Sequence, residues 1–385
     1  MLVFVIPTSY PNPENPVANS FVMEQVKALS MHSDCKIVVL NVQKKGTKKI
    51  FRSIDKNIHF VKNEEADIIR TKSKTFFEKK LMILNLLAFN ISMKRLYEKA
   101  VERYGKPDII YAHFYAAAYS AIRIASKSNV PVVVMEHSGE LMKSHLHFRE
   151  TVLLKYVINH SCKYIATTSN LKTMVKKHTR TKKAIEVISN IVDDSFSFYP
   201  LQNSNTFTYV AVSRLEYDKR IDMLINAFCE AFNKNENVCL RIGGMGSEYA
   251  HLQHLIESAG RNNQIKLLGV LKRNDVVTEI RNSSCFVLPS RHETFGLVWR
   301  EALCVGRPVI TTDHGGFSSY DWNDEFGIMI PVDDKPALVE ALRNIKTNYD
   351  KYNLEHISTQ NRKMYSSKVV GDAIYSLLMD EIKEK

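Results

Sequence analysis

The sequence contains no hydrophobic run long enough to cross a lipid bilayer. Its longest apolar segment, Leu81 to Ile91, is 11 residues long and includes two asparagines, whereas a spanning helix needs about 20 apolar residues. The first residues, Met1 to Pro7, lack the basic start of a secretory signal and are typical of a first strand. We therefore expect a cytoplasmic protein.

Cysteine pairs and metal motifs are also missing. The six cysteines form no CxxC pair and no metal-like spacing, and several lie within apolar runs, which is typical of reduced core residues. No DxD-like motif follows a predicted strand; Asp193-Asp194 and Asp333-Asp334 are interpreted as loop carboxylates. We expect no bound metal and no resident cofactor. A nucleic-acid motif is absent as well, so no nucleic acid is expected as a partner.

Positive charge is concentrated in the first half. The chain has 385 residues and a formal net charge of +12; residues 1–200 carry 31 Lys and Arg against 17 Asp and Glu, whereas 201–385 carry 22 against 24. Such an excess suits an anionic membrane surface or an acidic acceptor, although it also fits a plain solvated surface. The length allows two domains with cores of their own, and the polar segment 202–205 predicts the boundary between them.

Residues 286–316 predict a strand, a loop, a helix and a second strand. The first apolar run ends at the polar loop 290–296, and in parallel α/β sheets ligands bind beyond the carboxyl ends of the strands. Glu293 lies in this loop, and Glu301 follows eight residues later, about two helical turns along.

The predicted helix begins at Phe295, Gly296 and Leu297, where unpaired backbone N–H groups favour an anion. Two carboxylates beside an anion cradle match the phosphates and hydroxyls of a nucleotide sugar.

The same stretch closely resembles the signature of retaining, family-4-type glycosyltransferases of the GT-B fold, the glycosyl transferases group 1. The resemblance rests on E-x7-E from Glu293 to Glu301, preceded by LPSR and followed by EAL, GRPVI and GG. It implies an α/β fold with two doubly wound, Rossmann-like parallel-sheet domains facing across a cleft. Residues 1–200 would bind the acceptor and 205–364 the donor, with a C-terminal helix at about 365–385 packing back on the first domain.

A second motif carries the resemblance further. VSRLEYDKRIDMLINAF is similar to the family pattern GRLxxxKGxDxLIxA, with Ser213 and Arg220 in place of its glycines. Two cations before a helix start are suited to a diphosphate, so Arg214 and Lys219 are assigned to the donor phosphates. By resemblance, Gly244 and Gly246 of a GxGxE loop border the nucleotide, Glu293 positions the donor sugar and Glu301 binds the ribose.

Candidates in the first half lie at predicted strand ends. His137, in the segment EHSG, matches the family histidine that approaches the donor sugar, and His113 is a weaker acceptor-side candidate. Asn19 and Ser20 stand where the family carries glycine near the donor phosphate, and either could instead cap the following helix with its side chain.

Two further segments are predicted in this half. Ile37 to Val42 forms a strand, with lysines 44, 45, 48 and 49 on a loop after it. Residues 74–104 form a long helix with an apolar middle and basic flanks, which either lies in a membrane interface or covers the sheet of its own domain.

The resemblance implies a retaining, metal-independent hexosyltransferase that moves a sugar from a UDP- or GDP-sugar to a glycan or lipid-linked acceptor, as in bacterial surface polysaccharide biosynthesis. It would work in the cytoplasm or as a peripheral protein on the inner face of the cell membrane. Two alternatives stay open: a GT-B-like nucleotide-sugar epimerase and a non-catalytic, two-lobed sugar-binding protein.

Overall fold

The chain forms two units, each built on its own parallel sheet. Unit 1 comprises residues 1–191 and 367–385, and unit 2 comprises 192–366. The predicted residues Lys48, Lys49, Gly315 and Gly316 lie outside the described residues. The structure, a computed structural model, describes residues 1–15, 18–47, 57–76, 82–202, 204–293, 295–313 and 322–384.

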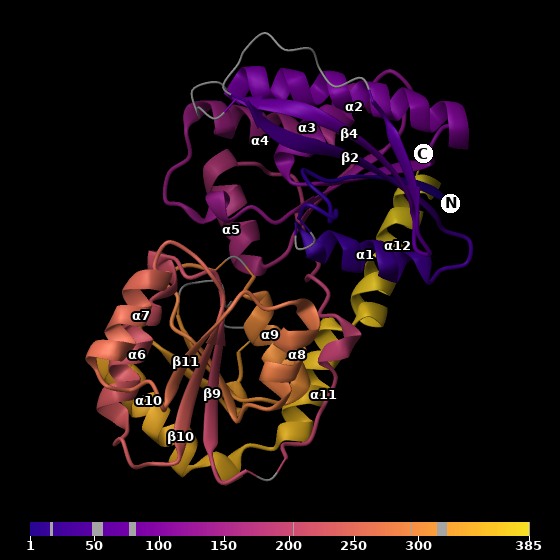
Figure 1. Ribbon diagram of the computed structural model, residues 1–385. Helices are drawn as coiled ribbons and strands as arrows, with labels where there is room; N and C mark the ends of the chain where they lie inside the picture. Colours follow the sequence, from indigo (N-terminus) through magenta and orange to yellow (C-terminus); the bar gives the residue numbers. More distant parts are fainter. Residues whose placement is uncertain are drawn as a thin grey trace. The chain divides into compact units, whose positions relative to one another are not determined.

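Unit 1 has an eight-stranded sheet in the order β3-β4-β2-β1-β5-β6-β7-β8. Figure 1 shows two of its paired strands, β2 and β4, side by side. All neighbouring strands are parallel except the β3–β4 pair, which is antiparallel. The strands are β1 (Leu2–Ile6), β2 (Lys36–Thr47), β3 (His59–Lys62), β4 (Asp67–Phe76), β5 (Ile109–His113), β6 (Val132–Glu136), β7 (Lys163–Ala166) and β8 (Glu186–Val187).

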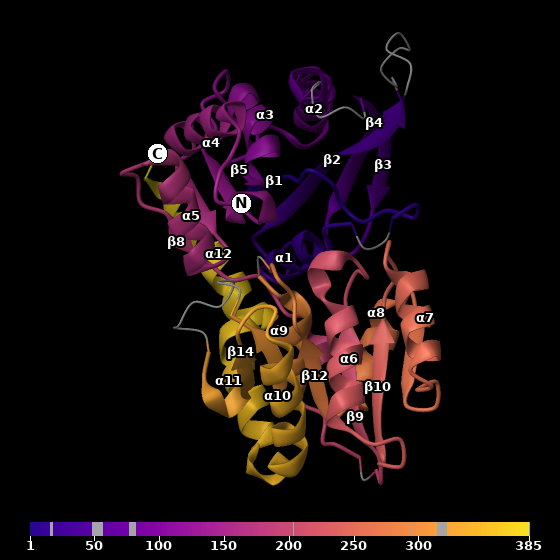
Figure 2. The ribbon, with the colours of Figure 1, turned by 90° about the vertical axis from the view of Figure 1, so that its left-hand side faces the viewer.

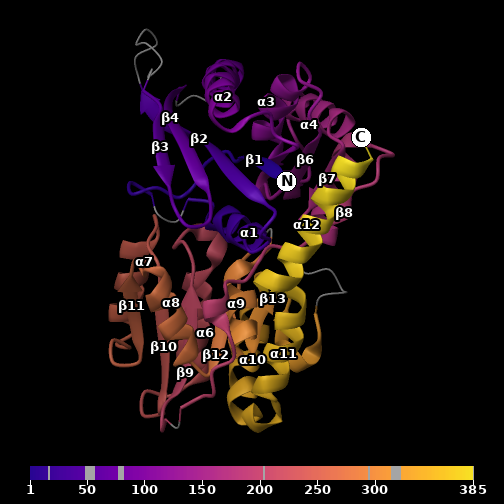
Figure 3. The same cartoon turned by 90° about the vertical axis from the view of Figure 1, so that its right-hand side faces the viewer.

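Helices cover both faces of this sheet. Because side chains alternate along a strand, Phe4 and Ile6 of β1 pack on one face with α2–α5, while Val3 and Val5 pack on the other with α1 and α12. α12 contacts α1 although the two are far apart in sequence (Figure 3). The helices are α1 (Ser20–Ser30), α2 (Met82–Tyr104), α3 (Tyr115–Ala125), α4 (Phe148–His160), α5 (Ser169–Thr179) and α12 (Ser367–Lys383).

Unit 1 differs from the prediction next to its β3–β4 edge. Lys44 and Lys45 continue β2 instead of lying on a loop, because β4 pairs with β2 over the whole stretch from Val38 to Thr47. The predicted helix over residues 74–104 begins only at Met82, because β4 extends to Phe76. The rest of that helix covers the sheet of its own domain, which is one of the two alternatives that the sequence left open. Within the part of the chain that is described, no helix is long and apolar enough to span a bilayer.

Unit 2 has a six-stranded parallel sheet in the order β11-β10-β9-β12-β13-β14. The order reverses direction at β9, where the chain moves from β11 to β12. In such sheets the switch point is where a ligand crevice opens. The strands are β9 (Phe207–Val212), β10 (Val238–Gly243), β11 (Ile265–Gly269), β12 (Cys285–Leu288), β13 (Val309–Thr312) and β14 (Gly327–Ile330).

The helices of unit 2 also cover both faces of its sheet. Figure 1 shows α6, α7 and α10 on one face and α8, α9 and α11 on the other, and one continuous apolar core joins them to the strands. These two doubly wound sheets confirm the predicted α/β fold class. The helices are α6 (Ile221–Ala231), α7 (Tyr249–Ser258), α8 (Arg273–Arg281), α9 (Leu297–Val305), α10 (Lys335–Thr347) and α11 (Leu354–Tyr365).

Candidate active site

A cavity of about 230 Å³ opens at the carboxyl ends of β9 and β12 in unit 2. Three segments meet there: the loop after β9, the loop after β12 and the first turn of α9. This is the sheet's switch point, where the sequence predicted the donor site. The lining residues are Val212, Ser213, Arg214, Lys219, Leu288, Glu293, Gly296, Leu297, Val298 and Trp299.

Lys219 and Glu293 form an ion pair in this cavity. The Lys219 ammonium donates to Glu293 Oε1 at 2.8 Å and to the His292 carbonyl at 3.1 Å, and Lys219 is only 8% exposed. The Ser290 hydroxyl donates to the same Glu293 oxygen at 3.2 Å. Lys219, predicted to bind phosphate, and Glu293, predicted to be catalytic, are therefore bonded to each other. The His292 carbonyl and the Ser290 hydroxyl further fix their positions.

Arg214 and the start of α9 supply the remaining positive character. Arg214 is exposed, and among the described residues no carboxylate pairs with it. The N–H groups of Leu297 and Val298 have no acceptor within the helix, because the first turn never does. Gly296 precedes them in the left-handed conformation, and a Cβ there would lie 1.7 Å from Trp299 Nε1. Glycine at this position therefore lets the backbone turn tightly into the helix.

Arg220 replaces the family glycine yet keeps a glycine-like backbone. Its φ is 52°, in the left-handed region, which costs a non-glycine residue roughly 1 kcal/mol. Its guanidinium pairs with Asp222 at 3.2 Å and also with Asp333. Arg291 donates to Asp333 at 2.8 Å, so the ion pairs join the loops after β9, β12 and β14.

Glu301 is fully buried on α9 and does not line the cavity. Its Oε1 accepts a hydrogen bond from Arg273, the first residue of α8, at 2.6 Å. The Arg273 guanidinium also lies 4.4 Å from the centre of the Phe196 ring. Sequence reasoning gave no role to either arginine. Arg273 stands outside the resembled motifs, and Arg291 ends the LPSR segment but was assigned no function.

Gly244 and Gly246 allow two loops of unit 2 to approach each other. A Cβ on Gly244 would lie 1.8 Å from the Ser213 carbonyl oxygen, and one on Gly246 would lie 2.2 Å from that of Leu215. The glycines thus place the turn after β10 directly against the loop that carries Arg214. Phe295 packs in the core at 5% exposure, so only its backbone belongs to the helix start.

In unit 1 the structure brings His113 and His137 together. His113 Nδ1 lies 3.1 Å from His137 Nε2, and both side chains are buried at the ends of β5 and β6. Burial lowers the pKa of His113 to about 3. Burial, and then the proximity of His113, lowers the pKa of His137 well below its ordinary value. The two form a neutral, hydrogen-bonded pair instead of two independent sites.

Aromatic rings fix the orientation of His137. The Phe21 ring centre lies 4.5 Å from that of His137 and the Phe114 ring centre lies 5.2 Å away. Phe114 itself has φ 68°, a strained conformation for an aromatic residue. Within the described residues His113 Nε2 is buried without a hydrogen-bond partner, whereas the Asn190 side chain hydrogen-bonds His137 and partly opposes the lowering of its pKa.

Glu136 supports this strand end and was missed by sequence reasoning. Its carboxylate accepts from the Tyr164 hydroxyl at 2.8 Å and from the backbone N–H groups of Tyr115, His137 and Ser138 at 2.9–3.0 Å. Burial raises the pKa of Glu136, while these hydrogen bonds oppose the shift. The residue ties the EHSG segment to the start of α3.

Asn19 precedes α1 but does not cap it. Its side chain donates to Thr8 Oγ1 at 3.2 Å and to Ser9 Oγ at 2.9 Å, and no side-chain cap hydrogen bond forms at this helix start. The predicted capping role is therefore wrong. Asn19 has φ 47°, so it adopts the backbone conformation of the glycine that it replaces. Ser20 is the first residue of α1.

The paired aspartates serve the loops, as the sequence suggested. Asp193 caps the short helical turn 194–196, and Asp334 caps α10. Asp194 pairs with Arg362, and Asp333 pairs with Arg220 and Arg291. Across the described ranges no group of three or more His, Cys, Asp or Glu side chains is arranged to hold a metal ion. All six cysteines are free, two of them buried and four partly buried.

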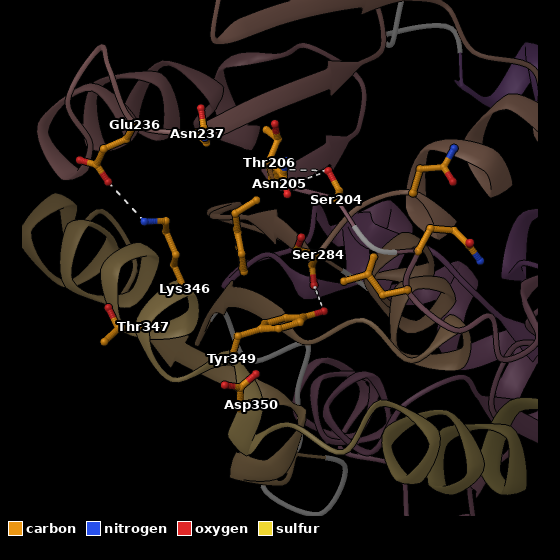
Figure 4. Close-up of a pocket in the computed structure, with 14 residues that line it drawn as sticks. Ser204, Asn205, Thr206, Glu236, Asn237, Ser284, Lys346, Thr347, Tyr349 and Asp350 are labelled. Carbon is orange, nitrogen blue, oxygen red and sulfur yellow. Dashed lines mark hydrogen bonds and ion pairs between the residues drawn. The ribbon is translucent and has the colours of Figure 1, made fainter.

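A larger cavity of about 650 Å³ lies at the opposite edge of the unit 2 sheet (Figure 4). It borders the amino ends of β9, β10 and β12. Its polar groups are engaged with one another: Lys346 pairs with Glu236 at 3.3 Å, and Tyr349 donates to the Ser284 carbonyl at 2.9 Å. Because ligands of parallel sheets bind at the other edge, this cavity is not the candidate site.

The switch-point cavity and the two doubly wound sheets define an α/β protein of the GT-B class. Comparison with known families then specifies the kind of enzyme. Residues 193–364 match the family described as glycosyl transferases group 1, and residues 47–196 match glycosyltransferase family 4. The two matches identify the chain as a glycosyltransferase of the GT-B fold.

Individual relatives are distant. The chain is 25% identical over 263 residues to glycogen synthase of Mycobacterium tuberculosis, covering 65% of this chain and 63% of that enzyme. Sucrose-phosphate synthase from Thermosynechococcus elongatus has the same fold, with a TM-score of 0.79 at 15% identity over 100% and 99% of the two chains. HepE from Anabaena, solved with UDP and glucose, gives 0.72 at 16% identity over 99% and 100%.

Proposed function

We propose that the chain is a retaining, family-4-type glycosyltransferase that moves a sugar from a UDP- or GDP-sugar to a glycan or lipid-linked acceptor. The observation that carries the proposal is the unit 2 cavity in which Arg214, Lys219, Glu293 and the first turn of α9 converge. The HepE structure with UDP and glucose supports a nucleotide-sugar donor. Residues 205–364 would bind this donor and residues 1–200 the acceptor.

In this reaction a bond forms between the acceptor oxygen and the anomeric carbon as the bond from that carbon to the diphosphate breaks. The acceptor's proton passes to a phosphate oxygen on the same face of the sugar. Arg214, Lys219 and the α9 amides would stabilise the charge of the leaving diphosphate without a metal ion. Arg214 can bind phosphate through two parallel hydrogen bonds, and Lys219 acts as a point charge.

The other candidates complete this scheme. Glu293 accepts hydrogen bonds from the donor sugar hydroxyls, and the backbone at Gly244 and Gly246 borders the nucleotide. The resemblance assigns the ribose to Glu301, which is fully buried beside Arg273 and outside the cavity, so the ribose would have to displace Arg273 to reach it. His137 orients the sugar from its place at the end of β6. Asn19, Ser20 and His113 contribute from the side of unit 1 where its strands end.

The charge of the first 200 residues supports an anionic acceptor. Residues 1–200 carry 31 cationic against 17 acidic side chains, which favours a phosphate-bearing carrier at a membrane surface. We therefore infer a cytoplasmic enzyme that works peripherally on the inner face of the cell membrane, in the assembly of a bacterial surface polysaccharide.

The first test is a thermal-shift panel with UDP-, GDP- and ADP-sugars and the free nucleotides. A ligand present at about 100 times its Kd stabilises the native state by roughly 2.7 kcal/mol. We expect one donor to raise the Tm, and the Arg214→Ala variant to bind it roughly ten- to hundredfold more weakly, because a charge-assisted hydrogen bond is lost. Lys266→Ala, which removes an exposed cation of β11, is the matched control.

Turnover then separates the alternatives. Consumption of the donor only when an acceptor is present, with the anomeric configuration kept in the product's NMR spectrum, supports a retaining transferase. Conversion of the donor to another nucleotide sugar without an acceptor would indicate the epimerase. A Tm shift with no turnover of any kind would indicate the binding protein, and no shift with any donor, with or without magnesium, would reject the donor site.

A further inference from the structure

In unit 1, α2 lies on the outside of the sheet beside α3 (Figure 2), and its outer side carries an apolar stripe. Leu84, Leu87 and Ile91, spaced three and four residues apart, lie on one side of the helix and are 43–50% exposed. The other side of α2, with Phe89 and Met93, packs against the sheet. The first half of the helix is thus apolar on both sides, and a solvent-facing apolar stripe indicates a binding surface when it continues onto neighbouring elements.

The stripe does continue across α3, which packs beside α2, and α4, which packs beside α3. A hollow of about 390 Å³ between α2 and α3 is lined by Leu87 and Ile91, and one of about 630 Å³ reaches from α3 to α4 beside Phe148 and Val152. Arg123 of α3 lines both hollows. We call this region the α2–α4 surface, defined by Leu84, Leu87, Ile91, Arg123, Phe148 and Val152.

Phe148 is the most protruding part of this surface. It begins α4 and is 81% exposed. An exposed aromatic side chain contributes little to the stability of the fold. Its full burial against a partner would contribute roughly 1.5–3 kcal/mol of binding free energy. Val152, one helical turn further along α4, is 49% exposed and extends the apolar area.

The charged side chains around the two hollows are mostly cationic. The linings include Lys94, Arg123, Lys127 and Arg149 against the single carboxylate of Glu98, a net charge of +3. Long cationic side chains can keep their aliphatic parts against an apolar layer while their charged groups reach its polar rim. Apolar protrusions inside a ring of cations fit an anionic lipid surface.

We propose that the α2–α4 surface binds an anionic lipid bilayer. Phe148, Leu87 and Ile91 enter the outer part of the acyl layer, and Arg123 and Arg149 contact lipid phosphates. Charge favours this occupant over a second copy of the chain, because a symmetric contact would set two +3 surfaces against each other. Insertion of apolar groups combined with basic contacts supplies the two signals that stable surface binding requires.

The surface is connected to the candidate site of unit 1 by α3. α3 begins at Tyr115, two residues after His113, and Arg123 lies eight residues further on, roughly 12 Å along the helix axis. Binding here would bring the proposed acceptor-binding residues 1–200 to the membrane that holds a lipid-linked acceptor. The inference thus rests on the proposed lipid-linked acceptor for its purpose, while the binding itself is measurable without donor or acceptor.

The test is flotation of the full chain with vesicles of phosphatidylcholine alone and of phosphatidylcholine mixed with phosphatidylglycerol. We expect binding only to the mixed vesicles, weakened by added salt. Ile91→Ser with Phe148→Ser should reduce the partition coefficient about tenfold or more, since two buried apolar side chains are lost. Arg123→Gln with Arg149→Gln should reduce it roughly tenfold by removing two phosphate contacts.

The matched controls remove the same chemistry elsewhere. Met31→Ser with Val270→Ser replaces two apolar side chains that are 71% and 77% exposed outside this surface, and Lys177→Gln with Lys266→Gln removes two exposed cations. Both controls should bind vesicles like the parent chain. Circular dichroism melting, together with the nucleotide thermal shift, shows whether each variant is folded.

Several results would overturn the proposal. These are no binding to mixed vesicles, equal loss in the controls, or full binding by both surface variants. Light scattering that shows a dimer, dissociated by Ile91→Ser with Phe148→Ser, together with no vesicle binding, would assign the surface to a second copy. Vesicle binding in the absence of any nucleotide-sugar shift would instead leave the surface intact and reject the transferase scheme.

Discussion

At the scale of single residues, Lys219 and Glu293 are held as a pair although their proposed ligands differ. The ammonium would face the diphosphate and the carboxylate the sugar, yet their charged atoms lie 2.8 Å apart. The pair is largely buried, and removing one member of a buried pair leaves the other uncompensated. Substitution of Lys219 and substitution of Glu293 should therefore affect nucleotide binding differently.

Glu293→Gln should leave the affinity for free nucleoside diphosphate unchanged or a few-fold stronger, because the carboxylate that competes for Lys219 is neutralised. It should lower turnover by about 100-fold, since the sugar contact that we propose is lost. Lys219→Met should weaken the nucleotide roughly tenfold or more, because a charge-assisted contact is removed. Calorimetric titration and initial rates measure both effects.

Asp218→Asn is the control for this pair, since Asp218 lies 3.5 Å from the Lys219 ammonium but is more exposed. It should change both quantities by less than Lys219→Met does. If Glu293→Gln weakened the free nucleotide as much as Lys219→Met, the carboxylate would be shaping the phosphate site and its assignment to the sugar would be wrong.

His113 should act on the sugar only through His137. His113 uses Nδ1 to reach its partner, and the side-chain amide of asparagine can place a polar atom near that position. We expect His113→Phe to lower kcat about five- to tenfold, the value of one lost hydrogen bond, and His113→Asn to restore most of it. Nitrogen chemical shifts of His137 report its tautomer and should change in the Phe variant only.

This expectation separates positioning from simple packing. If both variants lowered kcat equally while the His137 spectrum stayed unchanged, His113 would be a core residue and no more. A larger change in KM than in kcat would instead favour the acceptor-side role that the sequence first indicated for it.

At the scale of elements, two loops have a left-handed residue where the resembled family carries glycine. Asn19 and Arg220 both have left-handed backbones, with φ of 47° and 52°. Glycine adopts this conformation without strain, whereas these two residues are held in it by hydrogen bonds and ion pairs of their side chains. Asn19→Ala should lower the free energy of unfolding of unit 1 by about 2 kcal/mol, combining roughly 1 for the backbone and 1 for lost hydrogen bonds.

Asn19→Gly is the matched variant, since it loses the same hydrogen bonds but accepts the left-handed backbone. It should cost about half as much as Asn19→Ala. Urea unfolding followed by hydrogen exchange in α1 measures both. Equal losses for the two variants would show that the backbone conformation contributes nothing to the difference.

The strands that sequence reasoning located are those buried on both faces. β1 and β12 are continuous apolar runs, and β5, β6 and β9 are apolar except for His113, Glu136 and Thr208, because helices cover both sides of a parallel sheet. β4 was missed since its sequence DIIRTKSKTF mixes polar and charged residues. It is held by pairing with β2 and β3, and such contacts between distant segments leave little trace in local sequence.

The candidate site was predictable to the level of the loop. The rule that ligands bind at strand ends, together with the motif resemblance, selected the segments of Arg214, Lys219, Glu293 and His137. The partners of these residues were not predictable, because a 2.8 Å ion pair or a histidine pair depends on strand register and side-chain direction. Arg273 and Glu136 were missed for the same reason, although both hold the site's elements together.

At the scale of the whole molecule, the two units carry different reporters of their stability. Both tryptophans, Trp299 and Trp322, lie in unit 2, so their fluorescence follows that unit alone. The buried histidine pair lies in unit 1. Acid should therefore destabilise unit 1 through His113 and His137. Tryptophan fluorescence does not report this effect directly.

The sign follows from the pKa values. The pKa of His113 falls from 6.5 in the unfolded chain to about 3 in the folded one. Between these values the unfolded chain binds the additional proton, so stability rises with pH and is lost as pH falls below about 6.5. The pKa of His137 is lowered as well, and each histidine contributes a slope of at most about 1.4 kcal/mol per pH unit.

Glu136 acts in the opposite direction at lower pH. Burial raises its pKa above the ordinary 4.5, so the folded state binds the proton first and acidification through that pKa adds stability. The slope from His113 is half its maximum at pH 6.5 and approaches its full value about a unit lower, and it is partly offset nearer the pKa of Glu136.

Hydrogen exchange in β5 and β6, measured at several pH values from 7.5 to 5 (roughly the window that these shifts define), should show unit 1 losing protection on acidification. His113→Phe, which cannot take up a proton, should remove its share of the slope even if it lowers stability at neutral pH. A slope that is unchanged in His113→Phe would show that His113 is protonated to the same extent in the folded and unfolded chains. The neutral histidine pair would then be wrong, and with it the hydrogen bond through which His113 is proposed to position His137.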